Sequence, residues 1–114
     1  MSDQNTLTRL AAVIASRRQG AGNTSYTRQL LDAGPERCAK KFGEEAVETV
    51  IAGVGSNVEE LKAEAADTLY HLLVLLESRR VELADVMAIL EGRMGRGGLE
   101  EKASRPAPAA GSKS

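Results

Sequence analysis

Apolar residues recur along this chain at the three- and four-residue spacing that marks one face of an amphipathic helix. Stretches of this kind are separated by glycine, proline and polar breaks, and no sheet is needed to account for them. The predicted helices span residues 7–18, 25–33, 35–53, 58–79 and 81–93. We therefore expect an all-α fold, a compact antiparallel bundle of about five helices.

The third and fourth predicted helices are joined by the short segment VIAGVGSN. Gly53 and Gly55 are stop signals, and Ser56 with Glu59 matches the S-x-x-E capping box that opens a helix. A helical hairpin is therefore expected, in which the two helices lie face to face.

The fourth helix changes character along its length. Its run Leu72–Leu76 is apolar on all sides, which predicts cover on both sides and hence a second subunit. Its polar side is expected to carry Glu64, Asp67 and His71. A lone histidine is more often packed or hydrogen-bonded than a ligand, and we favour that interpretation for His71.

Two carboxylate clusters flank the turn of the hairpin: Glu44, Glu45 and Glu48 before it, Glu64 and Asp67 after it. Glu45/Glu48 and Glu64/Asp67 are i, i+3 pairs, so each projects from one helix face. Two carboxylates about 5 Å apart repel by about 3 kcal/mol at an effective dielectric of about 20, so cations are needed to hold them together. Oxygen ligands without nearby histidine or cysteine suit Mg²⁺. The alternative is a solvated surface of two ordinary helices.

Composition agrees with packed helices, because 42% of the residues are hydrophobic and only 3% are aromatic. The net charge of −1 gives no reason to expect binding to nucleic acid or to an anionic membrane. The charges are nevertheless unevenly distributed. Most of the charged residues in 1–41 are basic, whereas residues 44–67 carry seven acids and one lysine. This layout is expected where metal ions and phosphates meet.

A reducing, cytoplasmic location is the simplest expectation. Cys38 is the single cysteine, so no intramolecular disulfide can form, and the N-terminus does not resemble a signal peptide. From about Gly95 the sequence turns to Gly, Ala, Pro and Ser, which predicts a disordered tail over residues 95–114 and one folded domain over residues 1–94.

The pattern E-E-x-x-E followed by E-x-x-D resembles the all-α nucleoside triphosphate pyrophosphohydrolases of the MazG-like superfamily. The flanking sequence is similar to the phosphoribosyl-ATP pyrophosphatases of histidine biosynthesis. The segments that carry this similarity are SYTRQLLDAGPERCAKKFGEEAVETVIAG and EAADTLYHLLVLLESRRVELADVMAILEGR. The resemblance covers roughly residues 5–93. It implies Mg²⁺-dependent hydrolysis of a nucleotide, phosphoribosyl-ATP, to phosphoribosyl-AMP and pyrophosphate.

The resemblance also assigns residues to roles. Glu45, Glu48, Glu64 and Asp67 match the metal-binding acids, and Glu44 matches the additional acid, a candidate to accept a proton from water. Candidate substrate-binding residues match two further segments of the family: Ser25, Tyr26, Thr27, Lys40 and Lys41. Plain capping and packing is the alternative role for the three residues 25–27.

Two other functions compete with this one. A MazG-like enzyme acting on dUTP, dCTP or damaged nucleotides would need the same acids. The acids indicate that a metal and a triphosphate are bound, but they do not indicate which base the nucleotide carries. A non-enzymatic helical interaction module would use its acids only for solvation. Many relatives are fused to a cyclohydrolase domain, but this chain lacks the length for one, so a separate cyclohydrolase is expected to act next.

Overall fold

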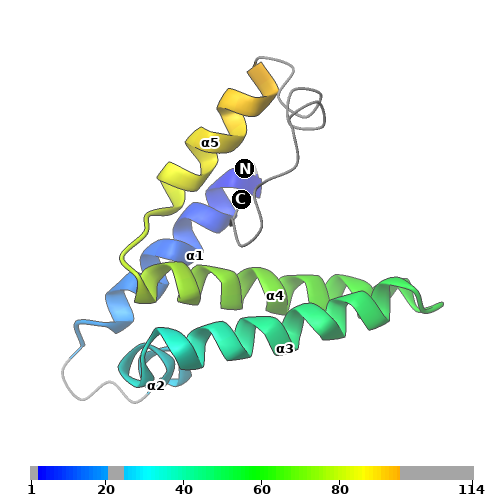
Figure 1. Ribbon diagram of the computed structural model, residues 1–114, viewed down its shortest axis with the longest axis horizontal. Helices are drawn as coiled ribbons and strands as arrows, with labels where there is room; N and C mark the ends of the chain where they lie inside the picture. Colours follow the sequence, from blue (N-terminus) through cyan, green and yellow to red (C-terminus); the bar gives the residue numbers. More distant parts are fainter. Residues whose placement is uncertain (1–2, 21–24, 96–114) are drawn as a thin grey trace, which may run out of the picture. The chain divides into compact units, whose positions relative to one another are not determined.

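A computed structural model describes residues 3–20 and 25–95 of the chain. These ranges contain helices and no strand, which confirms the all-α prediction. The helices are α1 (Asp3–Arg17), α2 (Tyr26–Ala33), α3 (Pro35–Gly53), α4 (Val58–Ser78) and α5 (Leu83–Gly95) (Figure 1). Contacts divide the chain into two units, Met1–Leu83 and Ala84–Ser114. The predicted tail beyond residue 95 lies outside the described residues.

The longest helices, α3 and α4, lie side by side and antiparallel (Figure 1). Gly34 ends α2 with φ 101°, a backbone conformation that glycine adopts without strain, and Pro35 then opens α3.

The predicted capping box at the start of α4 is wrong. Asn57, not Ser56, is the N-cap, and its side-chain oxygen accepts a hydrogen bond from the Glu60 amide at 3.1 Å. Asn caps a helix as well as Ser does, and with Asn57 as the N-cap the helix begins at Val58, the predicted first residue.

The core of the first unit combines residues from four helices, and the predicted apolar stripes of α1, α2 and α4 converge there. Its buried members are Ile14, Leu30, Leu31, Cys38, Leu73 and Val74. Leu75 and Leu76 are partly buried against this cluster. The chain therefore covers much of the Leu72–Leu76 run by itself, and that run alone no longer requires a second subunit.

Three helix boundaries differ from the prediction by two residues or more, and one predicted helix face is wrong. Helix α1 begins at Asp3 rather than near residue 7. Helix α5 begins at Leu83 and ends at Gly95, rather than spanning residues 81–93. His71 is buried, so it does not share the exposed side of α4 with Asp67.

The end of α4 explains why Val81 lies outside a helix. Arg80 has a φ of 59°, and the Arg80 and Val81 amides donate to the carbonyls of Glu77 and Leu76 at 3.0 and 2.9 Å. This pair of bonds is the Schellman arrangement, which turns the chain sharply after a helix. Within the described residues, no helix combines the length and the apolar character needed to cross a bilayer.

Candidate metal centre

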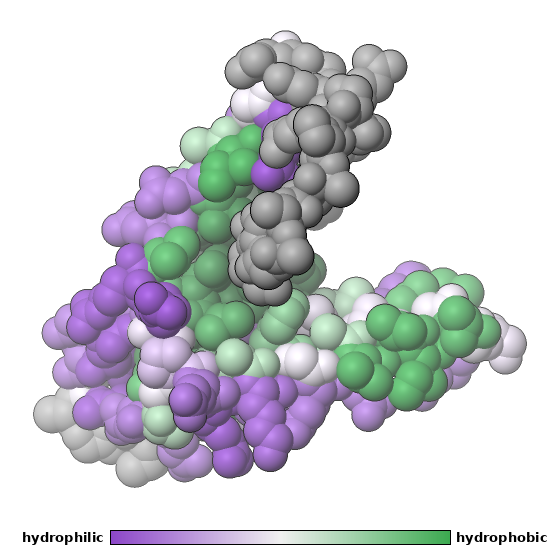
Figure 2. Space-filling model, in the orientation of Figure 1, coloured by the Kyte–Doolittle hydropathy of each residue, from purple (hydrophilic) through white to green (hydrophobic). Residues whose placement is uncertain are grey.

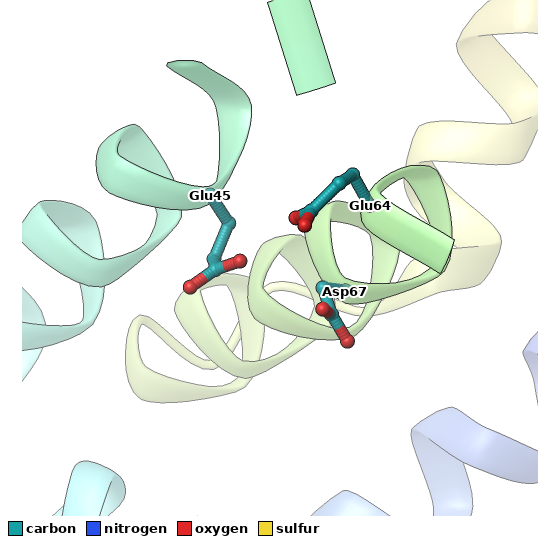
Figure 3. Close-up of side chains that lie close together, drawn as sticks. All are labelled: Glu45, Glu64 and Asp67. Carbon is teal, nitrogen blue, oxygen red and sulfur yellow. The ribbon is translucent and has the colours of Figure 1, made fainter. Parts of the chain in front are cut away.

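Three carboxylates from two helices meet on the α3–α4 pair. Glu45 of α3 faces Glu64 and Asp67 of α4, and one oxygen from each lies within 4.8 Å of the others (Figure 3). Glu64 and Asp67 share a face because they are three residues apart on one helix. The antiparallel pairing of α3 with α4 supplies the third carboxylate. The predicted convergence of acids from both helices is therefore present in the structure.

The other two acids of the predicted site lie differently. Glu48 is outside the group of three, although its negative charge is among the causes that raise the pKa of Glu64. Glu44 forms an ion pair with Lys41, with the two charged atoms 3.2 Å apart. The hydrogen bond from Lys41 to Glu44 raises the pKa of the lysine, which therefore stays charged. Glu44 and Glu48 flank the group of three.

The pKa of Glu64 shows that the acids repel one another. It is raised above its ordinary value of 4.5, first by burial and then by the negative charges of Glu48, Asp67, Glu45 and Glu60. A divalent cation would remove both causes, because it replaces lost solvation and neutralises the neighbouring charges. The donor set is three carboxylates without histidine or cysteine, which fits a hard cation such as Mg²⁺.

We expect the raised pKa of Glu64 to make the folded, metal-free protein less stable as the pH rises. A carboxyl whose pKa is higher in the folded state contributes stability below its unfolded pKa of 4.5, and this contribution is lost as the pH rises through the folded pKa. Glu64→Gln does not titrate there. In EDTA, its melting temperature should therefore exceed that of the unmodified chain by a margin that grows as the pH rises above 4.5 and then becomes constant. A margin independent of pH would contradict this expectation, and Glu59→Gln, altered at an exposed ion pair, is the control.

Behind the carboxylates lie two threonines that the sequence analysis did not single out. The Thr49 hydroxyl lies 2.9 Å from the Glu64 carbonyl and 2.6 Å from the Thr68 hydroxyl. The Thr68 hydroxyl lies 2.9 Å from the Glu45 carbonyl. A signal for them was present in the sequence, because each threonine follows an acid of the cluster by four residues, one helical turn.

The segment Ser25-Tyr26-Thr27 has two side chains in structural roles. The Ser25 hydroxyl caps α2 by accepting a hydrogen bond from the Arg28 amide at 3.1 Å. The Thr27 hydroxyl is buried and bonds to the hydroxyl of Tyr70 at 2.5 Å. Tyr26 is 49% exposed. Of these three residues, Tyr26 therefore has the most surface available to a ligand, and Lys40 on α3 is also exposed.

His71 is packed between two tyrosines. Its ring lies edge-on to Tyr70 at 4.8 Å between centroids and to Tyr26 at 6.0 Å. Burial lowers its pKa below the ordinary value of 6.5, which favours the neutral ring. Its Nδ1 has no hydrogen-bond partner among the described residues. The packing role favoured for this histidine agrees with its burial.

Gly43 lies inside α3, immediately before Glu44 and Glu45. A Cβ atom built at this position meets nothing within 4 Å. No other part of the described chain therefore requires a glycine here.

Comparison with known proteins gives one consistent result. Residues 7–94 match the family model described as phosphoribosyl-ATP pyrophosphohydrolase. The chain is 57% identical over 100 residues to phosphoribosyl-ATP pyrophosphatase 1 of Rhodopseudomonas palustris, an alignment that covers 88% of this chain and 94% of the relative. It is 57% identical over 99 residues to the phosphoribosyl-ATP pyrophosphatase of Paracoccus denitrificans, covering 87% and 92%. A relative from Bradyrhizobium diazoefficiens, also called phosphoribosyl-ATP pyrophosphatase 1, is 57% identical over 100 residues, covering 88% and 94%.

Proposed function

The chain belongs to the phosphoribosyl-ATP pyrophosphohydrolase family, and we propose that its three clustered carboxylates hold the Mg²⁺ with which it acts. Its activity is the hydrolysis of phosphoribosyl-ATP to phosphoribosyl-AMP and pyrophosphate in histidine biosynthesis. The resemblance inferred from the motifs is thereby confirmed, and a non-enzymatic interaction module is excluded by the family assignment.

The single observation that supports the metal assignment is the meeting of Glu45, Glu64 and Asp67 within 4.8 Å. Carboxylates at this separation repel in the absence of a cation, and this repulsion adds to burial in raising the pKa of Glu64. We place Glu48 at the edge of the same site, where it approaches Glu64 from α3.

The chain's own residues would divide the work as follows. Glu45, Glu64 and Asp67 hold the ion, which when bound neutralises the triphosphate and lowers the pKa of a bound water. Glu44 accepts the proton of the attacking water, with Lys41 beside it to stabilise its charged form. Further substrate contacts are proposed for positively charged and hydroxyl groups, of which Tyr26 and Lys40 are exposed: Ser25, Tyr26, Thr27, Lys40 and Lys41.

The test is to incubate the pure protein with Mg²⁺ and a panel of nucleotides, and to measure pyrophosphate release. Phosphoribosyl-ATP should be hydrolysed fastest, and EDTA should abolish the reaction, with activity restored by added Mg²⁺. Faster hydrolysis of dUTP or dCTP would assign the chain to another substrate within the MazG-like superfamily. Full activity in EDTA would exclude the proposed metal site.

We also propose that the protein is a homodimer or a larger homo-oligomer, on a different ground from the leucine run. Large apolar side chains on α3 and at the start of α4 are exposed, and Figure 2 shows hydrophobic surface gathered at the end of the α3–α4 pair where the two helices are joined. The exposed residues there are Val47, Val50, Ile51, Val54 and Val58. Val54 is 86% exposed. A patch of this kind is typical of an interaction surface.

We expect Val50→Glu to dissociate the oligomer, because it would place a charge in the apolar interface. Light scattering would show the loss of mass. Val13→Glu is the matched control, since Val13 is an exposed apolar residue on α1 and should leave the mass unchanged. A monomer for the unmodified chain at micromolar concentration would contradict the proposal.

Two further proposals follow from the sequence and the pathway. We place the enzyme in the cytoplasm, because the free thiol of its buried Cys38 suits a reducing environment. A separate cyclohydrolase is placed next, to act on the phosphoribosyl-AMP that this reaction releases.

A further inference from the structure

We propose that Thr49 and Thr68 are positioning residues that set the spacing of the carboxylates of Glu45 and Glu64. The inference rests on the metal site proposed above, which it deepens. It concerns the side of α3 and α4 that lies behind the acids, where the two helices contact each other. Neither threonine would contact the metal or the substrate; each would act through the backbone of an acid.

The contacts join the two helices at the residues that carry the ligands. Thr49 of α3 reaches the Glu64 carbonyl of α4 at 2.9 Å, and Thr68 of α4 reaches the Glu45 carbonyl of α3 at 2.9 Å. The two hydroxyl oxygens are 2.6 Å apart. Thr49 also lies 3.2 Å from the carbonyl of Glu45 on its own helix. The two hydroxyl groups therefore link α3 to α4 next to the backbones of Glu45 and Glu64.

The number of protons limits how these bonds can form. Each threonine hydroxyl has one hydrogen, and a separation of 2.6 Å between the two oxygens requires one of these hydrogens to lie between them. In one arrangement Thr68 donates to Thr49, and Thr49 donates to the Glu64 carbonyl. In the other, Thr49 donates to Thr68, and Thr68 donates to the Glu45 carbonyl. Both arrangements contain two hydrogen bonds that cross between the helices.

These bonds oppose the force that the acids exert. Repulsion between Glu45 and Glu64 favours separation or sliding of α3 against α4, which would change the distances between their oxygens. Mg²⁺ demands a near-octahedral ligand geometry, and groups behind the ligands of a metal commonly maintain their orientation. The threonine pair is placed one turn after each acid, where it holds the two helices in register.

The experiment measures metal binding directly, with Mn²⁺ as the probe and its free concentration followed by electron paramagnetic resonance. The double variant Thr49→Val/Thr68→Val keeps both side-chain shapes and removes both hydroxyls. We expect its affinity for Mn²⁺ to fall by about tenfold or more. Its stability without metal should change little, because valine fills the same space and both partners of the shortest bond, between Thr49 and Thr68, are replaced together. A purely structural pair would instead change stability and leave affinity unaltered.

Two further variants control for packing. Thr49→Ser/Thr68→Ser keeps the hydroxyls but loses the methyl groups, and should bind Mn²⁺ like the unmodified chain. Ser78→Ala removes a hydroxyl of α4 that bonds to the Leu75 carbonyl at 2.7 Å, far along the helix from the acids, and should also leave affinity unchanged. If the double valine variant does not fold, Thr68→Val takes its place. It removes the Thr68 hydroxyl and leaves one bond between the helices, from Thr49 to the Glu64 carbonyl, so a smaller fall in Mn²⁺ affinity is expected and an unchanged affinity would overturn the positioning role.

The possible outcomes separate the two proposals. An unmodified chain that binds no Mn²⁺ would overturn the metal site and this inference with it. Binding by the unmodified chain, with equal affinity in the valine variants, would overturn the positioning role alone. Weakened binding in the serine variant as well would assign the effect to packing and also overturn it.

Discussion

Glu45→Gln and Asp67→Asn are each expected to lower turnover of phosphoribosyl-ATP by about three orders of magnitude or more. Each change preserves the size of the side chain and removes one negative charge from the group of three carboxylates. A neutral amide binds a hard cation more weakly than a carboxylate does. Because the acids would act together on one ion, the loss of either one should remove most of the activity.

The same variants should not be less stable in the absence of metal. The carboxylates repel one another, so removing a charge relieves unfavourable energy in the folded state. In EDTA we therefore expect a melting temperature equal to or above that of the unmodified chain. Added Mg²⁺ should raise the melting temperature of the unmodified chain, since a ligand that binds only the folded state stabilises it, and should affect the variants less.

Glu59→Gln provides the matched control. Glu59 is also an acid of α4, but its side chain is 80% exposed and pairs with Lys62, away from the three clustered acids. Its replacement should preserve activity and the response to Mg²⁺. Unchanged turnover in both Glu45→Gln and Asp67→Asn would overturn the metal-site assignment.

The acids could be identified from the sequence because their residue type and their spacing both indicate a cluster of carboxylates. Carboxylates three residues apart share a helix face whatever surrounds the helix, so Glu64 and Asp67 had to lie together once α4 formed. The approach of Glu45 required only that the short turn before α4 make a hairpin. The threonines behind them were missed because a hydroxyl gives no charge signal. The role of such a hydroxyl depends on which groups face it from the neighbouring helix.

Burial was harder to predict, since periodicity shows which residues share a face but not what covers that face. His71 was placed on the polar side of α4, yet it is only 5% exposed because Tyr26 and Tyr70 pack against its ring. The leucine run was expected to need a second subunit, yet much of it packs within the chain. Conversely, Val50 and Ile51 continue the apolar pattern of α3 and remain exposed.

Hydrolysis of phosphoribosyl-ATP is expected to exceed hydrolysis of ATP by about a hundredfold or more in kcat/KM. Both molecules present a triphosphate to the carboxylates, so the metal site cannot distinguish them. The difference must come from contacts between the protein and the additional phosphoribosyl group. A phosphate bound by a positive side chain and a hydroxyl donor can supply it, since charged hydrogen bonds are the stronger kind.

The structure narrows the groups that can make these contacts. The hydroxyls of Ser25 and Thr27 are engaged in capping and in the bond to Tyr70. Lys41 is paired with Glu44. Tyr26 and Lys40 are exposed, and they are the first residues to test.

Tyr26→Phe, which removes only the hydroxyl, and Lys40→Ala should lower kcat/KM for phosphoribosyl-ATP more than for ATP if they contact the added group. Lys62→Ala is the control, because this exposed lysine of α4 pairs with Glu59 and should leave both activities unchanged. An equal fall for both substrates would place Lys40 at the shared triphosphate instead. Comparable kcat/KM for ATP and phosphoribosyl-ATP in the unmodified protein would contradict the expected discrimination, because the phosphoribosyl group would then add nothing to recognition.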